Sequence, residues 1–150
     1  MDFLPISLVI KDRPCVVVGG GEVATRKTQM LLRARARVTV IAPALADALQ
    51  QLQGLSRIRH VAEAFRDEHL DDAMLVIAAT DDQSVNESVH RAAIARRIPV
   101  NVVDHPRLCT FAMPAIIDRS PVLIAISSGG VAPVLARLLR ARIESMLPAS

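Results

Sequence analysis

The sequence of 150 residues has no tryptophan or tyrosine, three phenylalanines and two cysteines. Sites for single-stranded nucleic acid commonly stack bases on aromatic side chains, so this composition argues against a nucleic-acid partner. Cys15 and Cys109 lack the number and the spacing of a disulfide framework or a cysteine metal motif. We therefore expect a reducing, cytoplasmic setting and no metal site built on cysteine.

Long apolar runs and a strong charge excess are also missing. No stretch approaches the roughly 20 apolar residues of a membrane-spanning helix, and the first residues lack the basic start and cleavage site of a signal peptide. We expect neither membrane association nor export. The formal net charge is +3, and the 16 arginines among 18 basic residues are scattered. Such arginines suit carboxylates and phosphates better than a nucleic-acid surface, which needs a basic face.

What is present is a globular composition with alternating patterns. Hydrophobic residues make up 51% of the chain, enough for one compact core. Short apolar bursts alternate with segments of helical period, which is typical of strand–helix units on a parallel sheet. The predicted fold class is α/β, a Rossmann-like parallel sheet over residues 1–112. Strands are expected at 5–10, 15–19, 37–42, 57–61, 74–80 and 99–103, and helices at 22–34, 44–52 and 82–97.

Residues 113–150 have a different pattern. The stretch AIIDRSPVLIAI (115–126) predicts a β-hairpin that turns at DRSP. Pro133 then stands in the first turn of a helix that runs to about residue 147, and the apolar positions of this helix form one broad stripe. We predict a dimerisation arm that makes the protein a homodimer. Packing of the stripe on the first domain is the alternative.

The stretch VVVGGGEVA (16–24) carries the pattern G-x-G-x-x-G/A between a strand and a helix, with Gly19, Gly21 and Ala24 at the three positions. The first glycine permits a tight turn, the second lets a pyrophosphate approach the backbone, and the small third residue lets the helix pack on the strand. The helix then offers unpaired N–H groups to the phosphates. The pattern predicts a dinucleotide site, and a plain tight turn is the alternative.

One part of the dinucleotide pattern is missing. NAD sites usually carry an acidic residue about 20 residues further on, which binds the ribose hydroxyls. Residues 40–43 read VIAP and hold no acid, and no arginine stands at this strand end to bind a 2′-phosphate. Backbone groups of residues 42–44 would then have to hold the ribose. The spacing alone leaves the type of cofactor open.

Polar residues follow two further strands, at the sheet edge where ligands bind in this fold. Thr80 and Asp81 are candidate cofactor contacts, although helix capping would explain Asp81 or Asp82 equally well. Asp104, in NVVDHP, could take or hold a proton beside a bound nicotinamide, or it could simply form a turn. For His105 we favour an exposed loop position over metal binding, and no metal site is predicted.

A loop SSGG (127–130) precedes the last helix and resembles a helix start. Capping of the helix would explain Ser127 and Ser128. Binding of a ligand carboxylate at this loop is the functional alternative.

Several stretches taken together resemble the N-terminal region of siroheme synthases, and they cover essentially the whole chain: DFLPISLVIKDRPCVVVGGGEVATRK, AATDD, NVVDHP and MPAIIDRSPVLIAISSGGVAPVLARLLRARIES. The resemblance implies a precorrin-2 dehydrogenase, in which NAD+ takes a hydride from precorrin-2 and sirohydrochlorin is formed. It also implies a ferrochelatase activity, with Fe2+ as a substrate that is inserted to give siroheme. Members of this family are homodimers that exchange the C-terminal arm.

The resemblance also implies roles for single residues. The family's catalytic aspartate falls on Asp104, which would assist proton removal in dehydrogenation and in metal insertion alike. Ser128 matches a serine that can be phosphorylated, where added negative charge would oppose a carboxylate-rich ring. The expected cofactor-binding residues are Gly19, Gly21, Glu22, Val23, Pro43, Ala44 and Thr80, without the ribose-binding acid. Candidate partners of the substrate carboxylates are Arg26, Arg107 and Arg119.

Two other functions are compatible with the sequence. The first is a dehydrogenase without chelatase activity, since no cluster of metal ligands is visible. The second is a non-catalytic nucleotide-sensing module of the same fold, which would leave the joint presence of NVVDHP and SSGG unexplained. The long siroheme synthases continue into a helical segment and a methyltransferase domain, whereas this sequence stops at SMLPAS, either as a fragment or as a short member of the family. Without that domain we do not expect it to methylate uroporphyrinogen.

Overall fold

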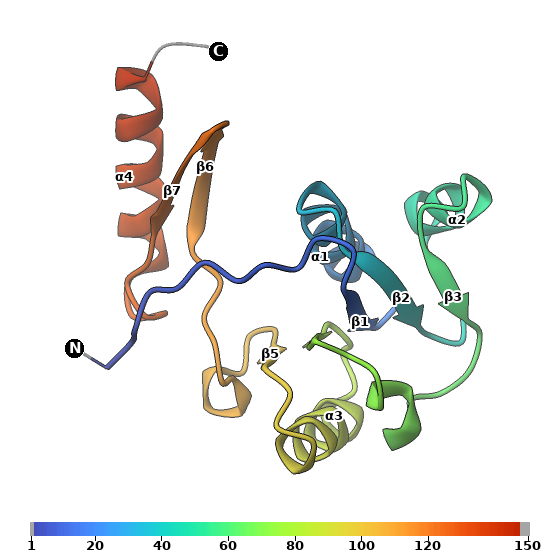
Figure 1. Cartoon of the computed structure of the whole chain (residues 1–150). Helices are drawn as coiled ribbons and strands as arrows, with labels where there is room; N and C mark the ends of the chain where they lie inside the picture. Colours follow the sequence, from blue (N-terminus) through green and yellow to red (C-terminus); the bar gives the residue numbers. More distant parts are fainter. Residues whose placement is uncertain (1, 148–150) are drawn as a thin grey trace. The chain divides into compact units, whose positions relative to one another are not determined.

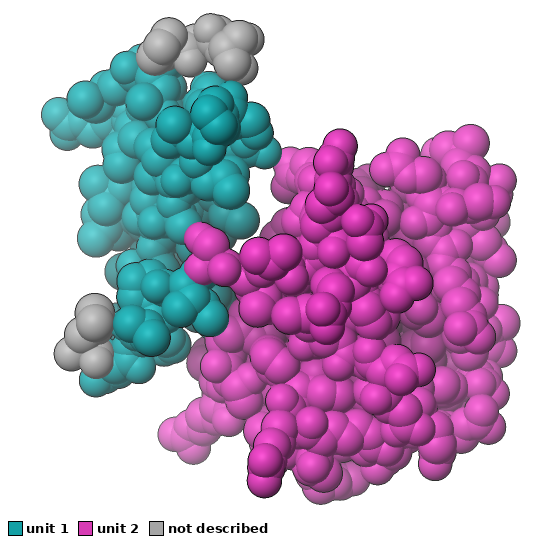
Figure 2. Space-filling model, viewed as in Figure 1, with its two compact units in different colours: residues 1–6, 112–150 teal, residues 7–111 magenta. Residues whose placement is uncertain are grey.

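The computed structural model describes residues 2–147, which form two compact units. Unit 2 is residues 7–111, and unit 1 is residues 1–6 and 112–150, of which 2–6 and 112–147 are described (Figure 2). Each unit has a sheet of its own, with five strands in unit 2 and two in unit 1. None of the helices in the described residues is long and apolar enough to cross a membrane.

Unit 2 is a parallel sheet with helices between its strands, so the α/β prediction is confirmed (Figure 1). The spatial order of the strands is β3-β2-β1-β4-β5, and every neighbouring pair is parallel. The strands are β1 (Pro14–Val18), β2 (Arg37–Ile41), β3 (Arg59–Val61), β4 (Leu75–Ala78) and β5 (Val100–Val102). The helices are α1 (Glu22–Arg33), α2 (Asp47–Gly54) and α3 (Gln83–Ala95), with 3₁₀ turns η1 (Asp67–Leu70) and η2 (Pro106–Leu108).

The central strands are apolar throughout because both of their faces are buried. Val17 and Val40 pack into a cluster that contains residues of α1 and α2, whereas Val16 and Val76 pack into a second cluster with residues of α3. Cys15 belongs to the first cluster, where burial raises the pKa of its thiol to about 11. Cys15 is therefore a packing residue, since almost no thiolate is present at neutral pH.

The order of the strands indicates where the ligand-binding crevice of the sheet is expected. After β1 the chain continues to β2 on one side, and β4 then occupies the other side of β1. In sheets of this kind ligands bind beyond the carboxyl ends of the strands, where the order reverses. The residues that follow β1, β4 and β5 therefore lie at the edge where a ligand is expected.

The strand expected at residues 5–10 is wrong, because residues 2–10 form no strand. Both sides of β1, the strand that follows this stretch, are occupied by β2 and by β4, so residues 5–10 cannot pair with it. Ile6 and Val9 are exposed, whereas Ile10 packs against the first cluster. The chain then turns through a hydrogen bond of 3.0 Å from the Arg13 N–H to the Ile10 carbonyl.

Unit 1 contains the predicted hairpin and helix, which are confirmed. The hairpin consists of β6 (Ala115–Arg119) and β7 (Val122–Ile126), which pair antiparallel, and α4 (Pro133–Met146) contacts both strands. Ile117 and Ala136 are the buried apolar residues of these elements, and Arg140 Nε donates to the Ile116 carbonyl over 3.0 Å. Most of the apolar side chains of the hairpin and of α4 are exposed.

Candidate functional site

The glycine loop after β1 combines two packed glycines with one that faces open space. Gly19 has φ +125°, which favours glycine, and a Cβ on Gly19 or Gly20 would collide with the backbone carbonyl of Ala79 or Ala44. A Cβ on Gly21 would meet no described atom within 4 Å. Packing within the protein therefore does not explain why residue 21 is a glycine. Close approach of a ligand to its backbone would explain it. The sequence pattern did not reveal the packing role of Gly20.

The start of α1 leaves backbone donors free. Gly21 is its N-cap residue and no side chain caps the helix, while the first intrahelical bonds run from Thr25 to the Gly21 carbonyl. The N–H groups of Glu22 and Val23 thus have no acceptor within the helix. Free N–H groups beside an open glycine fit the pyrophosphate of a dinucleotide, so the residues present fit NAD.

A second loop, between β2 and α2, is attached to the glycine loop. The Ala46 N–H donates to the Gly20 carbonyl over 2.7 Å, and the Gly19 N–H donates to the Ile41 carbonyl over 2.9 Å. Pro43 and Ala44 lie exposed between these attachment points. The structure thus brings these two expected cofactor residues to the same loop pair as Gly21, and their role in binding stays a prediction.

The turn after β4 is held by its own side chains. Asp82 caps α3 by accepting from the backbone N–H groups of Ser84 and Val85, at 2.8 and 3.2 Å, which decides between Asp81 and Asp82 as the cap. Asn86 is buried and donates to the Thr80 carbonyl over 3.0 Å. Thr80 Oγ1 accepts from the Asp82 N–H over 3.0 Å, so the turn positions Thr80 for any ligand contact.

Asp104 follows β5 in a loop that is tied back to that strand. Asp104 is exposed and has φ +62°. The return segment covers the free edge of β5: Thr110 exchanges bonds with Val100, Cys109 Sγ accepts from the Val102 N–H over 3.2 Å, and Asn101 Nδ2 donates to the Phe111 carbonyl over 3.0 Å. These bonds fix both ends of the Asp104 loop.

The Asp104 loop borders a surface hollow of about 460 Å³. Its lining includes Asp104, His105 and Arg107 from the loop, with Gln83 and Glu87 from α3. Gln83 Nε2 donates to Glu87 Oε1 over 2.9 Å, which orients that carboxylate. His105 thus lies beside Asp104 in an open hollow, and within residues 2–147 no three His, Cys, Asp or Glu side chains are grouped as metal ligands.

Lys27 also belongs to the surroundings of Asp104, although the sequence reasoning did not select it. This side chain on α1 is half-buried. Burial and the neighbouring Arg26 lower the pKa of Lys27, while the negative charge of Asp104 acts in the opposite direction. The available signal was the scarcity of lysine, since Lys11 and Lys27 are the only two in the chain.

Two of the predicted residues lie in unit 1. Ser128 is half-buried, and its Oγ accepts from the backbone N–H of Ala132, the N-cap residue of α4, over 3.0 Å. Arg119 forms an ion pair with Glu144 at 3.4 Å. The bond to Ser128 closes its loop, and the ion pair of Arg119 joins the hairpin to α4. Both side chains thus have a local structural explanation. Their roles toward a ligand stay predictions.

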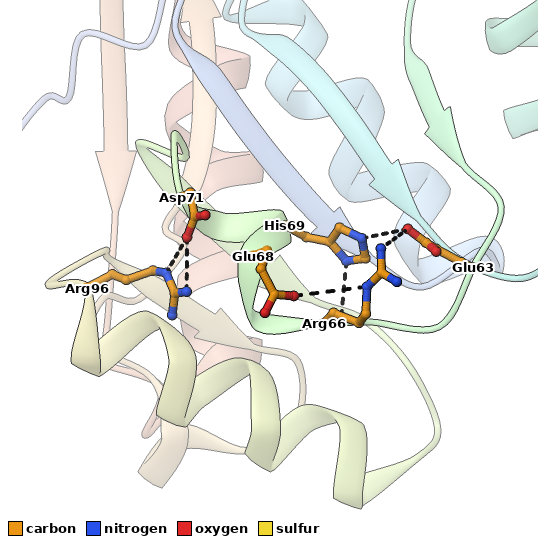
Figure 3. Close-up of polar contacts among 6 residues, drawn as sticks. All are labelled: Glu63, Arg66, Glu68, His69, Asp71 and Arg96. Carbon is orange, nitrogen blue, oxygen red and sulfur yellow. Dashed lines mark hydrogen bonds and ion pairs between the residues drawn. The ribbon is translucent and has the colours of Figure 1, made fainter.

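A charged cluster around η1 is satisfied within the protein (Figure 3). His69 Nδ1 accepts from the Arg66 N–H over 3.0 Å, and its Nε2 donates to Glu63 Oε1 over 2.9 Å. Arg96 pairs with Asp71 at 2.9 Å and so joins α3 to the residue that follows η1. Because the donors and acceptors pair with one another, this cluster is structural.

Comparison with protein families gives two matches along the chain. The family model described as "Putative NAD(P)-binding" matches residues 6–115. The model described as "Sirohaem biosynthesis protein central" matches residues 119–146.

Curated proteins similar to this chain include siroheme synthases. That of Nitrosospira multiformis is 62% identical over 152 residues, which is 99% of this chain and 32% of the relative. That of Methylobacillus flagellatus is 58% identical over 150 residues, which is 100% of this chain and again 32% of the relative. The chain thus spans about a third of the length of the curated relatives it matches.

A solved structure resembles the whole chain. The precorrin-2 dehydrogenase SirC superposes with a TM-score of 0.82 at 26% identity, over 98% of this chain and 72% of that protein. The parallel sheet, the hairpin and the last helix are therefore a combination that already occurs in a solved protein.

Proposed function

This chain belongs to the siroheme synthase family, in the part that the putative NAD(P)-binding model matches, and on this premise we propose that it oxidises precorrin-2 to sirohydrochlorin with NAD+. The observation that carries the proposal is the shared sheet edge. There the open glycine and the free N–H groups of α1 follow β1, and an exposed aspartate follows β5. The likeness to SirC, whose name states precorrin-2 dehydrogenase, supports the same reaction.

The chain's residues divide the work between holding the cofactor and moving a proton. NAD+, when bound, supplies the acceptor for the hydride that leaves precorrin-2. The N–H groups of Glu22 and Val23, beside Gly21, would bind the pyrophosphate, and the backbone at Pro43 and Ala44 would bind the ribose in place of an acidic side chain. Asp104 would accept the proton that leaves with the hydride, so two electrons and two hydrogens are accounted for.

An assay of both products tests this activity. The purified chain receives precorrin-2 and NAD+, and NADH is followed together with the absorbance of sirohydrochlorin. Equal amounts of both products are expected. In Asp104→Asn we expect turnover to fall about 100-fold or more, because a positioned proton acceptor is lost, while NAD+ binding is retained.

Asp72→Asn is the matched control. Asp72 is an exposed aspartate outside the sheet edge, so this variant should keep the parent rate. If the parent chain binds NAD+ but produces neither NADH nor sirohydrochlorin, the nucleotide-sensing module is the better description. If Asp104→Asn turns over like the parent, Asp104 is a turn residue only.

We extend the proposal to iron insertion, because the name of the relatives is siroheme synthase and because Asp104 shares its hollow with Glu87 and His105. These groups can accept the protons that pyrrole nitrogens release when Fe2+ enters the ring. Sirohydrochlorin and Fe2+, mixed with the chain under anaerobic conditions without NAD+, should give siroheme faster than without protein. No acceleration, with dehydrogenation intact, would identify a dehydrogenase without chelatase activity.

We also propose a homodimer, phosphorylation of Ser128 and a cytoplasmic location. A homodimer is supported by the exposed apolar side chains of the hairpin and of α4. Phosphorylation of Ser128 would disturb the hydrogen bond that its hydroxyl oxygen accepts from the Ala132 N–H; mass spectrometry of the protein from its cells would detect it. A cytoplasmic location is supported by the two free thiols, Cys15 and Cys109.

A further inference from the structure

Lys27 emerges at the margin of the buried face of α1. It lies three residues after Ala24 and four before Leu31, which are 0% and 2% exposed. Residues at this spacing share one face of a helix. The stem of Lys27 is therefore partly buried, and its ammonium is carried toward the border of the first apolar cluster.

The loop of Asp104 is flanked by residues that pack against the same apolar cluster. Val103 and Phe111, on either side of residues 104–110, pack against the cluster that contains Ala24 and Leu31. Lys27 and the Asp104 loop are thus both anchored on one apolar cluster. The carboxylate of Asp104 opposes the lowering of the Lys27 pKa by burial, which agrees with this placement.

The ammonium of Lys27 has no partner in the part of the chain that the structure describes. Four arginines, Arg66, Arg96, Arg119 and Arg140, each form an ion pair there. Lys27 forms neither an ion pair nor a hydrogen bond with a described residue. A partly buried charge without a partner costs folding free energy, and such costs are common where a ligand supplies the partner.

We propose that Lys27 is a ligand-binding residue, whose ammonium receives a carboxylate of the tetrapyrrole and holds the ring against Asp104. Its place on the second turn of α1 separates it from the N–H groups suited to phosphate. An ammonium–carboxylate contact is charge-assisted and stronger than a neutral hydrogen bond. The tetrapyrrole as ligand rests on the proposed function, whereas the carboxylate site can be tested without turnover.

Uroporphyrin, a stable tetrapyrrole polycarboxylate, is the probe. Its affinity is measured by fluorescence titration at two salt concentrations, for the parent and for three variants. Lys27→Met keeps the apolar stem and should weaken binding about 10-fold or more. Lys27→Arg should restore most of the affinity. Lys11→Met removes the same charge from an exposed residue and should bind like the parent.

Thermal unfolding of the free chain separates binding from structure. The pKa of Lys27 is lowered in the folded chain, so the folded state holds this proton less tightly than the unfolded state, and the charged form disfavours folding at neutral pH. Lys27→Met should therefore leave Tm unchanged or raise it. A lower Tm for Lys27→Met, with a parallel loss in Lys27→Arg, would mean a structural role and overturn the proposal.

The two lysines also allow a direct spectroscopic readout. After reductive ¹³C-methylation, which keeps the charge, the signals are assigned with Lys11→Arg and Lys27→Arg. Uroporphyrin should raise the pKa of the Lys27 signal, because a carboxylate favours the charged form. An unmoved Lys27 signal at saturating uroporphyrin would overturn the proposal. If uroporphyrin binding depends on Lys27 but the chain does not oxidise precorrin-2, the carboxylate site is upheld. Only the proposed dehydrogenase activity is then refuted.

Discussion

At the residue scale, three consecutive glycines lack a side chain for three different reasons. Gly19 has a left-handed φ, Gly20 packs against the Ala44 carbonyl, and Gly21 borders open space. Substitution at Gly19 or Gly20 therefore acts on folding, while substitution at Gly21 acts on whatever approaches its backbone.

A pair of alanine variants separates these effects. We expect Gly19→Ala to lose about 2 kcal/mol or more of unfolding free energy, because the new Cβ adds strain and a backbone clash. Gly21→Ala should change stability by less than about 1 kcal/mol but weaken NAD+ binding about 10-fold or more, because its methyl group enters the open space. Urea unfolding and calorimetric titration with NAD+ measure the two quantities.

Gly54→Ala is the control for the glycine pair, since no described atom lies within 4 Å of its added Cβ. It should bind NAD+ like the parent. Unchanged NAD+ affinity in Gly21→Ala would contradict the placement of the pyrophosphate.

At the element scale, β5 is an edge strand whose outer side is hydrogen-bonded to a loop. The Thr110 N–H donates to the Val100 carbonyl over 2.8 Å, and the Val100 N–H donates to Thr110 Oγ1 over 2.9 Å. This coverage leaves fewer groups of the edge free to pair with another chain. It also anchors the segment that carries Asp104.

Thr110→Val should destabilise unit 2 by about 1–3 kcal/mol, because the Val100 N–H loses its acceptor while the side-chain volume is nearly kept. Thr110→Ser retains the hydroxyl and serves as the control. Urea unfolding compares the three proteins. Equal stability of Thr110→Val and the parent would show that water replaces the lost acceptor.

The sequence predicted the helices and strands well, but it predicted strand pairing and the contacts between elements less well. Periodicity located the helices and the buried strands because their apolar spacing is local. It placed a strand at residues 5–10 because an apolar run does not reveal whether a neighbouring strand is available. The glycine motif indicated Gly19 and Gly21. The placement of Lys27 on the same apolar cluster as the Asp104 loop depends on the tertiary fold, and the scarcity of lysine is the one signal that the sequence offered for it.

At the scale of the whole molecule, the apolar surface of unit 1 is the feature that requires explanation. Leu123 of β7 and Leu138 of α4 are 65% and 64% exposed. Exposed apolar patches of this kind mark protein interfaces. The homodimer prediction implies that a second copy of the chain covers this apolar surface.

Leu138→Glu tests the dimer. We expect the association constant to fall about 30-fold or more, because a central apolar contact is replaced by a charge that would be buried. Sedimentation equilibrium measures the constant, and Arg137→Glu, an exposed neighbour on α4, is the control for acidic charge. A parent chain that is monomeric at high micromolar concentration would refute the dimer.

The hydrogen bonds that join the glycine loop to the loop before α2 have a thermodynamic consequence. The Gly20 carbonyl is held by the Ala46 N–H, and the Gly19 N–H is held by the Ile41 carbonyl, so both loops are ordered before any cofactor arrives. A dinucleotide that binds across them has little backbone entropy left to remove from the protein. Its affinity can then come from contacts to the main chain, which would let a site without an acidic side chain for the ribose hold its nucleotide.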